Sequence, residues 1–308
     1  MKKYALLAVG ELLGDFIGTE ISDDLSNAEK FQRFQGGSPA NLAANMARLG
    51  KETAVLSCVG DDNLGKYLVA EVAKTGVDIS YMVVDKTEPS SIVIVSRTKG
   101  TPDFIPYRTA DCMIKPEHIS DELLSQSAIF HTTCWPLSKN PAQATVLDAA
   151  KRATALGCQL SIDLNYAQKV WPNREEAHAV IKEYVGHGAL IKMSEDDAER
   201  FYGEPVDTDK VLADFHAWGA KLICFTLGAK GSIVSTEGGK ERIEIAGKPI
   251  EVVDATGAGD SYWAGFLTAF LEGHSPAVCA NAGVNLSALK LTTLGPLPAK
   301  IDSNILYN

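Results

Sequence analysis

The 308-residue chain lacks several features that would assign it to common protein classes. It has no apolar run of about 18 residues, the length that a membrane-spanning helix requires. The short apolar stretch at residues 4–9 is interrupted by Gly10 and Glu11, so we interpret it as a first buried strand and not as a signal peptide. We therefore expect a soluble, cytoplasmic protein with no membrane partner.

Paired cysteines and metal-ligand spacings are also missing. The cysteines are widely separated and form no C-x-x-C pair, which predicts free thiols in a reducing compartment and no structural metal site. They are Cys58, Cys112, Cys134, Cys158, Cys224 and Cys279. The six histidines show no metal-ligand spacing either.

Common nucleotide-binding and hydrolase motifs are absent. No G-x-x-x-x-G-K-[ST] occurs, and Tyr262 stands where a dinucleotide fingerprint beginning at Gly257 needs its third small residue. There is no G-x-S-x-G elbow. A formal net charge of -10 argues against a nucleic-acid partner, because such a surface needs clustered Lys and Arg.

From about residue 128 onward, short apolar segments alternate with helical patterns. The predicted strands are 128–132, 159–163, 189–193 and 221–226. Ser194 and Asp197 have the spacing of a capping box for the helix after the third of these strands. Strands separated by helices pair in parallel with right-handed crossovers, so we expect a layered α/β sheet with ligands at the carboxyl ends of its strands.

Two early segments, at about 11–35 and 91–108, have no helical period. The second alternates like a hairpin around Lys99 and Gly100. We predict that the two segments form a small β-sheet outside the main layer, a lid beside a binding cleft. Since no repeat or linker is evident, residues 1–308 are interpreted as one domain with this lid inserted.

The most informative motif is Asp254-Ala-Thr-Gly-Ala-Gly-Asp260, which runs into an apolar helical pattern. The glycine-rich start of such a helix presents backbone amides that can hold a transferring phosphoryl group. The Asp260 carboxylate can then face an incoming hydroxyl, which is a phosphotransferase arrangement. The structural alternative is that Asp260 only caps its helix.

A second glycine motif begins at Gly36-Gly37 and opens another helix. We interpret Ser38 as the cap and Pro39 as the first helical residue. The two glycines permit close approach of a ligand, and Asn41 offers a donor and an acceptor in the first turn. A purely structural role explains this motif about as well.

Further polar residues follow predicted strands. Asp15 is expected in a loop after the first strand, where its carboxylate can accept hydroxyl hydrogen bonds, and Arg108 could reach back into the cleft. Thr226, Gly228 and Gly231 end a buried strand and could hold nucleotide phosphates. A surface aspartate, a solvated arginine and a tight turn are the respective alternatives.

With both glycine motifs in view, the chain resembles the PfkB, or ribokinase-like, family of carbohydrate kinases. Segments 36–41, 59–65 and 254–260 look like the amino-terminal signature, the G-D-D-x-x-G segment and the carboxyl-terminal signature. The resemblance implies a three-layer α/β/α sandwich with a mostly parallel central sheet and a β lid. It also implies ATP as phosphoryl donor, Mg²⁺, and often a monovalent cation such as K⁺ held by backbone carbonyls.

The resemblance also assigns roles to residues of this sequence. It implies a catalytic base at Asp260 and an anion hole at Gly257, Ala258 and Gly259. It implies sugar ligands at Asp15, Gly36, Gly37, Asn41 and Asn165. It implies a nucleotide side at Lys192, Thr226, Gly228, Gly231 and Asn281, magnesium at Asp197, and a monovalent cation at Asp254 and Thr256.

Within that family, segments 100–108 and 130–133 look most like bacterial fructokinases, in which the residue matching Arg108 reaches the sugar pocket. Three positions depart from the family pattern: Ala167 replaces an arginine, Ser194 an asparagine and Asp197 a glutamate. We expect an ATP-dependent kinase that converts D-fructose to D-fructose 6-phosphate and that could form a homodimer through its lid. Ribose, 2-keto-3-deoxygluconate and nucleosides remain alternative acceptors, and a non-catalytic sugar or nucleotide sensor is the alternative of another class.

Overall fold

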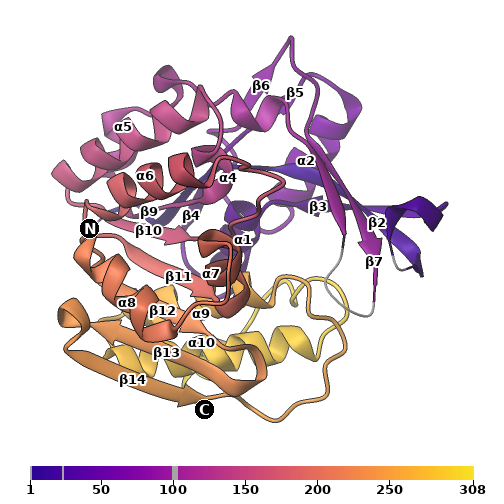
Figure 1. Ribbon diagram of the computed structural model, residues 1–308. Coiled ribbons are helices and arrows are strands. Elements are labelled where there is room, and N and C mark those ends of the chain that lie inside the picture. The colour runs from indigo at the N-terminus through magenta and orange to yellow at the C-terminus, as the bar shows by residue number, and fades with distance from the viewer. Residues whose placement is uncertain (1, 23, 99–102) are drawn as a thin grey trace.

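Strand β1 (Tyr4–Val9) shows why the central segments are almost wholly apolar. Its side chains alternate between two separate cores: Leu6 and Ala8 pack into one, and Leu7 and Val9 into the other. A strand buried on both faces reads as a continuous apolar run, as parallel sheets covered by helices do. The computed structural model, which describes residues 2–22, 24–98 and 103–308, has such a sheet at its centre (Figure 1).

The central sheet has eight strands in the order β14-β13-β12-β11-β10-β9-β1-β4. Its members besides β1 are β4 (Thr53–Leu56), β9 (Ser127–Thr133), β10 (Gln159–Asp163), β11 (Leu190–Ser194), β12 (Leu222–Thr226), β13 (Gly231–Thr236) and β14 (Glu241–Ala246). Pairing is parallel from β4 to β12 and antiparallel at the β13–β14 edge. The four strands predicted from the sequence are confirmed to within one residue at each end.

Helices cover both faces of this sheet, so the predicted α/β/α sandwich is confirmed (Figure 1). One face is covered by α3 (Asp121–Ser125), α4 (Cys134–Leu137), α5 (Ala142–Ala155), α6 (Arg174–Val185), α7 (Glu195–Tyr202) and α8 (Thr208–Ala217). The other is covered by α1 (Ser38–Arg48), α2 (Asn63–Ala73), α9 (Ala258–Leu271) and α10 (Pro276–Leu291). Among the described residues, no helix combines the length and the apolar character needed to cross a membrane.

A separate four-stranded sheet stands beside the sandwich and contains the two segments that lacked a helical period. Its order is β3 (Phe31–Gly36), β2 (Leu13–Ile21), β7 (Ile92–Arg97) and β8 (Phe104–Tyr107). Figure 1 shows it projecting from the sandwich. We call these four strands the lid sheet; the turn predicted at Lys99 and Gly100 lies outside the described residues. A further parallel pair joins β5 (Cys58–Gly60) and β6 (Val83–Asp85).

Two local predictions are corrected by this structure. Asp15 lies within strand β2 and not in a loop, paired across the sheet with Phe34 and Val93. Helix α1 begins at Ser38, but Gly37 is its N-cap and no side chain caps it. The capping box of Ser194 and Asp197 at the start of α7 is confirmed.

Candidate active site at the start of helix α9

Asp260 connects the two glycine motifs. It lies in the first turn of α9 and is only 9% exposed. Its carboxylate does not cap its own helix: one oxygen accepts a hydrogen bond of 2.6 Å from the Ser38 hydroxyl, and the other accepts one of 3.0 Å from the Asn41 amide. Segments more than 200 residues apart in sequence therefore meet at this carboxylate.

Ser38 was predicted to cap helix α1, but its side chain has a different role. Its hydroxyl donates to Asp260 and accepts a 3.1 Å hydrogen bond from the amide of Asn165, so it links the ends of three elements. Asn165 adopts a left-handed backbone conformation with φ of 41°, which asparagine tolerates better than most residues. We call Ser38, Asn41, Asn165 and Asp260 the central cluster.

The diglycine before α1 is required by neighbouring protein atoms. A Cβ on Gly36 would lie 2.3 Å from an oxygen of the Asp15 carboxylate. Gly37 has a φ of 116°, and a Cβ there would lie 2.3 Å from the carbonyl oxygen of Glu11. These glycines thus let the chain pass tightly between the lid sheet and the start of α1.

Two buried carboxylates lie beside the central cluster. Burial and the nearby Asp260 carboxylate raise the pKa of Asp15 to about 7. Burial raises the pKa of Glu11 to about 8, although the hydroxyl of Thr133 donates to it at 2.8 Å. Glu11, which the sequence analysis did not single out, also accepts from the backbone amide of Ser38 at 3.3 Å and so anchors the start of α1.

A buried ion pair lies beneath the start of α9. The Lys192 ammonium is 2.9 and 3.1 Å from the two oxygens of Asp163, its register neighbour on β10. Burial opposes the charge on Lys192, but Asp163 and Asp197 outweigh it and raise its pKa above the ordinary value. A Cβ on Gly259 would lie 2.8 Å from this ammonium, so the ion pair lies directly against the helix start.

The start of α9 also has the backbone that anion binding requires. Gly257 is the N-cap with φ of 73°, a conformation that suits glycine, and the first amides of a helix have no acceptor within it. The Ala258 amide makes a 3.2 Å turn bond to the carbonyl of Ala255. Backbone groups and Lys192 therefore converge on the end of α9 that carries Asp260.

The residues expected on the nucleotide side have different surroundings in the structure. Thr226, at the end of β12, pairs in register with Ser194 on β11, and Gly228 faces open space. Gly231 is explained by the β13–β14 hairpin, because its Cβ would lie 2.0 Å from the carbonyl oxygen of Ile245. Asn281 is exposed and donates to the carbonyl of Ala277 one turn earlier, so its side chain serves its own helix in this structure.

The residues proposed for metals are already engaged. The carboxylate of Asp197 accepts from the amide and hydroxyl of Ser194 and is 4% exposed, which does not fit a direct magnesium ligand. Among the described residues, no group of three or more His, Cys, Asp or Glu could hold a metal ion. The carboxylate of Asp254 accepts from the Thr256 amide at 3.0 Å and from the ammonium of Lys290 at 3.0 Å, so the expected K⁺ site already contains a protein cation.

Arg108 is buried in an ion pair of its own. Its guanidinium donates to the buried carboxylate of Asp111 and, at 2.8 Å, to the carbonyl of Trp135. It also donates to the hydroxyl of Ser138 at 2.6 Å. Arg108 was expected to reach back into the cleft, whereas in this structure its donors are directed at protein acceptors.

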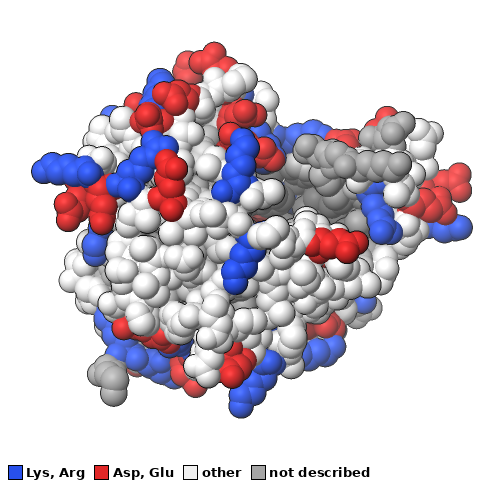
Figure 2. Space-filling view, turned by 90° about the horizontal axis from the view of Figure 1, so that it is seen from below, with Lys and Arg blue, Asp and Glu red and all other residues white. Residues whose placement is uncertain are grey.

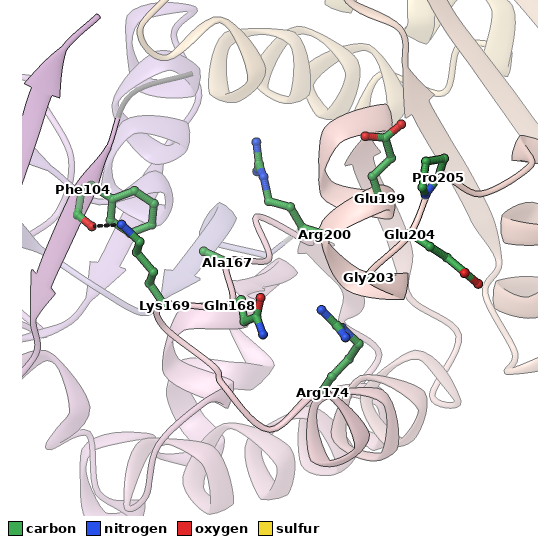
Figure 3. A pocket seen from close by; sticks show the side chains of 10 residues that line it. All are labelled: Phe104, Ala167, Gln168, Lys169, Arg174, Glu199, Arg200, Gly203, Glu204 and Pro205. Carbon is green, nitrogen blue, oxygen red and sulfur yellow. Dashed lines mark hydrogen bonds between the residues drawn. The ribbon is translucent and has the colours of Figure 1, made fainter. Parts of the chain in front are cut away.

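A hollow of about 510 Å³ lies next to this site, between lid strand β8 and helices α6 and α7 (Figure 3). Figure 3 shows Lys169 reaching across to the carbonyl of Phe104 on the lid sheet, a 3.0 Å hydrogen bond. The full lining is Phe104, Ala167, Gln168, Lys169, Arg174, Glu199, Arg200, Gly203, Glu204 and Pro205. The lining contains no residue of the central cluster, but it includes Ala167, where the family pattern has an arginine.

The face seen in Figure 2 is hollowed between the sandwich and the lid sheet, and positive and negative side chains are interspersed around the hollow. No continuous basic band is visible on this face among the described residues.

Comparison with known proteins defines the class to which this fold and site belong. The model of the pfkB family carbohydrate kinases matches residues 4–302, so the chain belongs to this family. It is an ATP-dependent sugar kinase, a phosphotransferase with an alcohol group as acceptor.

Three relatives illustrate the similarity. The chain is 37% identical over 300 residues to an ATP-dependent 6-phosphofructokinase of Thermoanaerobacterium thermosaccharolyticum, covering 96% of this chain and 90% of the relative. The structure of Halothermothrix orenii fructokinase matches with a TM-score of 0.81 and 32% identity, covering 92% and 97% of the two chains. An uncharacterized sugar kinase of Pyrococcus horikoshii in complex with ATP matches with a TM-score of 0.85 and 26% identity, covering 97% and 96%.

The central cluster predicts a specific effect of replacing Asp260. We expect Asp260→Asn to lower kcat by roughly 10²- to 10⁴-fold, because the variant loses the proton acceptor. Sugar affinity should change little, since an amide oxygen can still accept from Ser38. Steady-state kinetics and titration calorimetry measure the two quantities.

The matched control is Asp196→Asn, which removes the same charge from a carboxylate that is 72% exposed. It should retain wild-type kcat. Wild-type turnover in Asp260→Asn would exclude Asp260 as the base.

Proposed function

We propose that this kinase phosphorylates D-fructose on its primary C6 hydroxyl, giving D-fructose 6-phosphate. The observation that carries the proposal is the position of Asp260. Its carboxylate lies at the positive end of α9 and in hydrogen-bond contact with Ser38 and Asn41, at the start of the helix that follows the diglycine. A hydroxyl bound beside Asn41 and Asp15 would face the helix end suited to the terminal phosphate.

In the proposed reaction, Asp260 accepts the proton of the sugar hydroxyl as its oxygen attacks the γ-phosphorus of ATP. The transition state of phosphoryl transfer is loose, so the proton leaves late and positioning carries most of the acceleration. Ser38 and Asn41 hold the carboxylate in one orientation. The amides of α9, which start above the Lys192–Asp163 ion pair, then stabilise the transferring group.

The pairing of Arg108 supports a neutral acceptor. A sugar acid or sugar phosphate needs an uncompensated cation, and the guanidinium of Arg108 is neutralised by Asp111. Asp15 and the amide groups of Asn41 and Asn165 are suited to hydroxyl groups instead. This argument favours fructose over 2-keto-3-deoxygluconate.

A second candidate acceptor is D-fructose 6-phosphate. It is favoured by the 37% identical relative, which is named an ATP-dependent 6-phosphofructokinase. With that acceptor the same Asp260 would activate the other primary hydroxyl of the sugar. The two acceptors differ by one phosphate, so a direct comparison separates them.

An ADP-release assay with a panel of acceptors tests the assignment. The panel contains fructose, fructose 6-phosphate, ribose, tagatose, 2-keto-3-deoxygluconate and adenosine. We expect fructose to have the highest kcat/KM, by roughly tenfold or more, because a site built for hydroxyl groups discriminates through its buried polar partners. A higher kcat/KM for fructose 6-phosphate would reassign the enzyme as a phosphofructokinase.

Sugar binding should depend on pH through Asp15. Because its pKa is raised to about 7 in the free protein, this group is mainly protonated at pH 6 and ionised at pH 8. The ionised form accepts stronger, charge-assisted hydrogen bonds from hydroxyls, so the sugar affinity should rise about three- to tenfold from pH 6 to pH 8.

Calorimetric titration with fructose across this range provides the measurement. Asp15→Asn should bind more weakly and with a flat pH profile. An unchanged pH dependence in that variant would assign the titration to another group.

We further propose that two copies of this chain pair through their lid sheets. Exposed apolar side chains gather on these strands: Ile21, Phe31, Ile105 and Tyr107 are 37–62% exposed. Ile105 and Tyr107 lie two residues apart on β8 and so share a face of the sheet. An apolar face of this kind favours association with a second sheet.

Sedimentation velocity checks this pairing. The wild-type protein should sediment as a dimer, and Ile105→Glu should shift it toward monomer because a charge would be buried in the interface. The control Val84→Glu changes an exposed apolar residue, 53% exposed, outside the lid sheet. A monomeric wild-type protein would refute the pairing.

A further inference from the structure

The ammonium of Lys290 lies in a cage of oxygen atoms near the start of α9. It is 3.0 Å from a carboxylate oxygen of Asp254, 3.3 Å from the carbonyl oxygen of the same residue and 3.3 Å from the carbonyl oxygen of Thr293. Lys290 is 5% exposed although it is a lysine, a residue type seldom buried without a partner. An ammonium has three N–H donors, and the cage offers three acceptors.

This cage joins two loops. Asp254 belongs to the segment that leads into α9, whereas Thr293 follows the end of α10. The carboxylate oxygen of Asp254 that does not contact Lys290 accepts from the Thr256 amide at 3.0 Å. The oxygen that contacts Lys290 also accepts from the Gly295 amide at 3.1 Å. The charge of Lys290 is thus at the centre of the contacts that hold the chain just before Gly257.

The donor set is one that a metal cation could also occupy. A carboxylate and backbone carbonyls are the oxygen ligands preferred by hard cations. Lys290 is in the last turn of α10, where the helix dipole favours a positive charge. A second cation at the same oxygens would meet a like charge at contact distance, so the ammonium and a metal ion exclude each other.

The pKa of Asp254 reflects its hydrogen-bond partners. Burial acts to raise its pKa, but hydrogen bonds from the Thr256 amide and the Lys290 ammonium outweigh burial and leave the pKa below the ordinary value. The Asp254 carboxylate is therefore ionised throughout the neutral range.

We infer that Lys290 is a built-in replacement for a monovalent cation, and that it positions the start of α9 for phosphoryl transfer without any metal ion in this cage. The inference rests on the proposed role of that helix start. Its consequence is a kinase whose turnover does not respond to the identity of the monovalent salt.

The first test uses the wild-type enzyme. Turnover is measured with the acceptor preferred in the panel above, in potassium, sodium or tetramethylammonium chloride at one ionic strength. Equal kcat in the three salts is expected, because the ammonium of Lys290 already occupies the cage. Tetramethylammonium, which is too large to enter an oxygen cage, is the reference salt. Activation by potassium over tetramethylammonium would overturn the inference.

The second test removes the ammonium while retaining an unbranched chain. In tetramethylammonium chloride, Lys290→Met should lower kcat by roughly 10- to 100-fold, the cost of misplacing positioned groups. Potassium should restore much of this loss by entering the vacated cage. A loss that no cation relieves, in a variant with wild-type circular dichroism, would overturn the replacement role.

Thermal unfolding gives a readout that does not depend on turnover. Potassium should raise the melting temperature of Lys290→Met relative to tetramethylammonium but leave that of the wild type unchanged, because a ligand stabilises only the fold that binds it. The control Lys300→Met removes the same charge from an exposed side chain and should show neither effect. These shifts would stand even if fructose proved not to be the acceptor, and if the variant failed to fold, the wild-type salt comparison would still decide.

Discussion

The pair of hydrogen bonds from Ser38 and Asn41 to the Asp260 carboxylate is the interaction on which the site depends. It connects the first turn of α1 to the first turn of α9, two helices that pack on the same face of the central sheet. A buried carboxylate without donors would be destabilising, so these two donors both stabilise the packing of the helices and fix the orientation of the candidate base. The same two hydrogen bonds thus set the relative position of α1 and α9 and the orientation of the Asp260 carboxylate.

Around that interaction, charge is arranged in two layers. Asp260 and Asp15 are neighbouring acidic groups, whereas under Gly259 the ammonium of Lys192 is paired with Asp163 of the central sheet. The proximity of two carboxylates is reflected in the raised pKa of Asp15. A sugar hydroxyl would meet acceptors from one side, and a phosphoryl group would meet donors from the other, which is the polarity that transfer between them requires.

The strands of the central sheet could be predicted from the sequence, but the positions of several functional side chains could not. Strands β9 to β12 were predictable because a strand buried on both faces is apolar throughout. Asp15 was misplaced because β2 contains Gly14 and Gly18, and glycines weaken the alternation by which a strand is recognised. The role of Ser38 was missed because its residue type also suits a helix cap, and only the positive φ of Gly37 makes the glycine the cap instead. Glu11 gave no signal in the sequence, since an acid in the loop after a buried strand is usually exposed.

Lys290 shows why an implied cofactor needs to be tested against the side chains around it. The family resemblance implies a monovalent cation at Asp254 and Thr256, whereas in this structure the cation beside Asp254 is the ammonium of Lys290, 36 positions away at the end of α10. The occupancy of such a cage by a metal ion depends on the concentration of the ion, and the ion must lose water to enter. A lysine side chain is part of the chain at any salt concentration, and holding it in place costs only side-chain conformational entropy. The tether also couples the end of α10 to the start of α9 through a covalent chain. The helix start proposed to face the phosphate would then be fixed by the fold itself, through the contacts of Lys290 with Asp254 and Thr293.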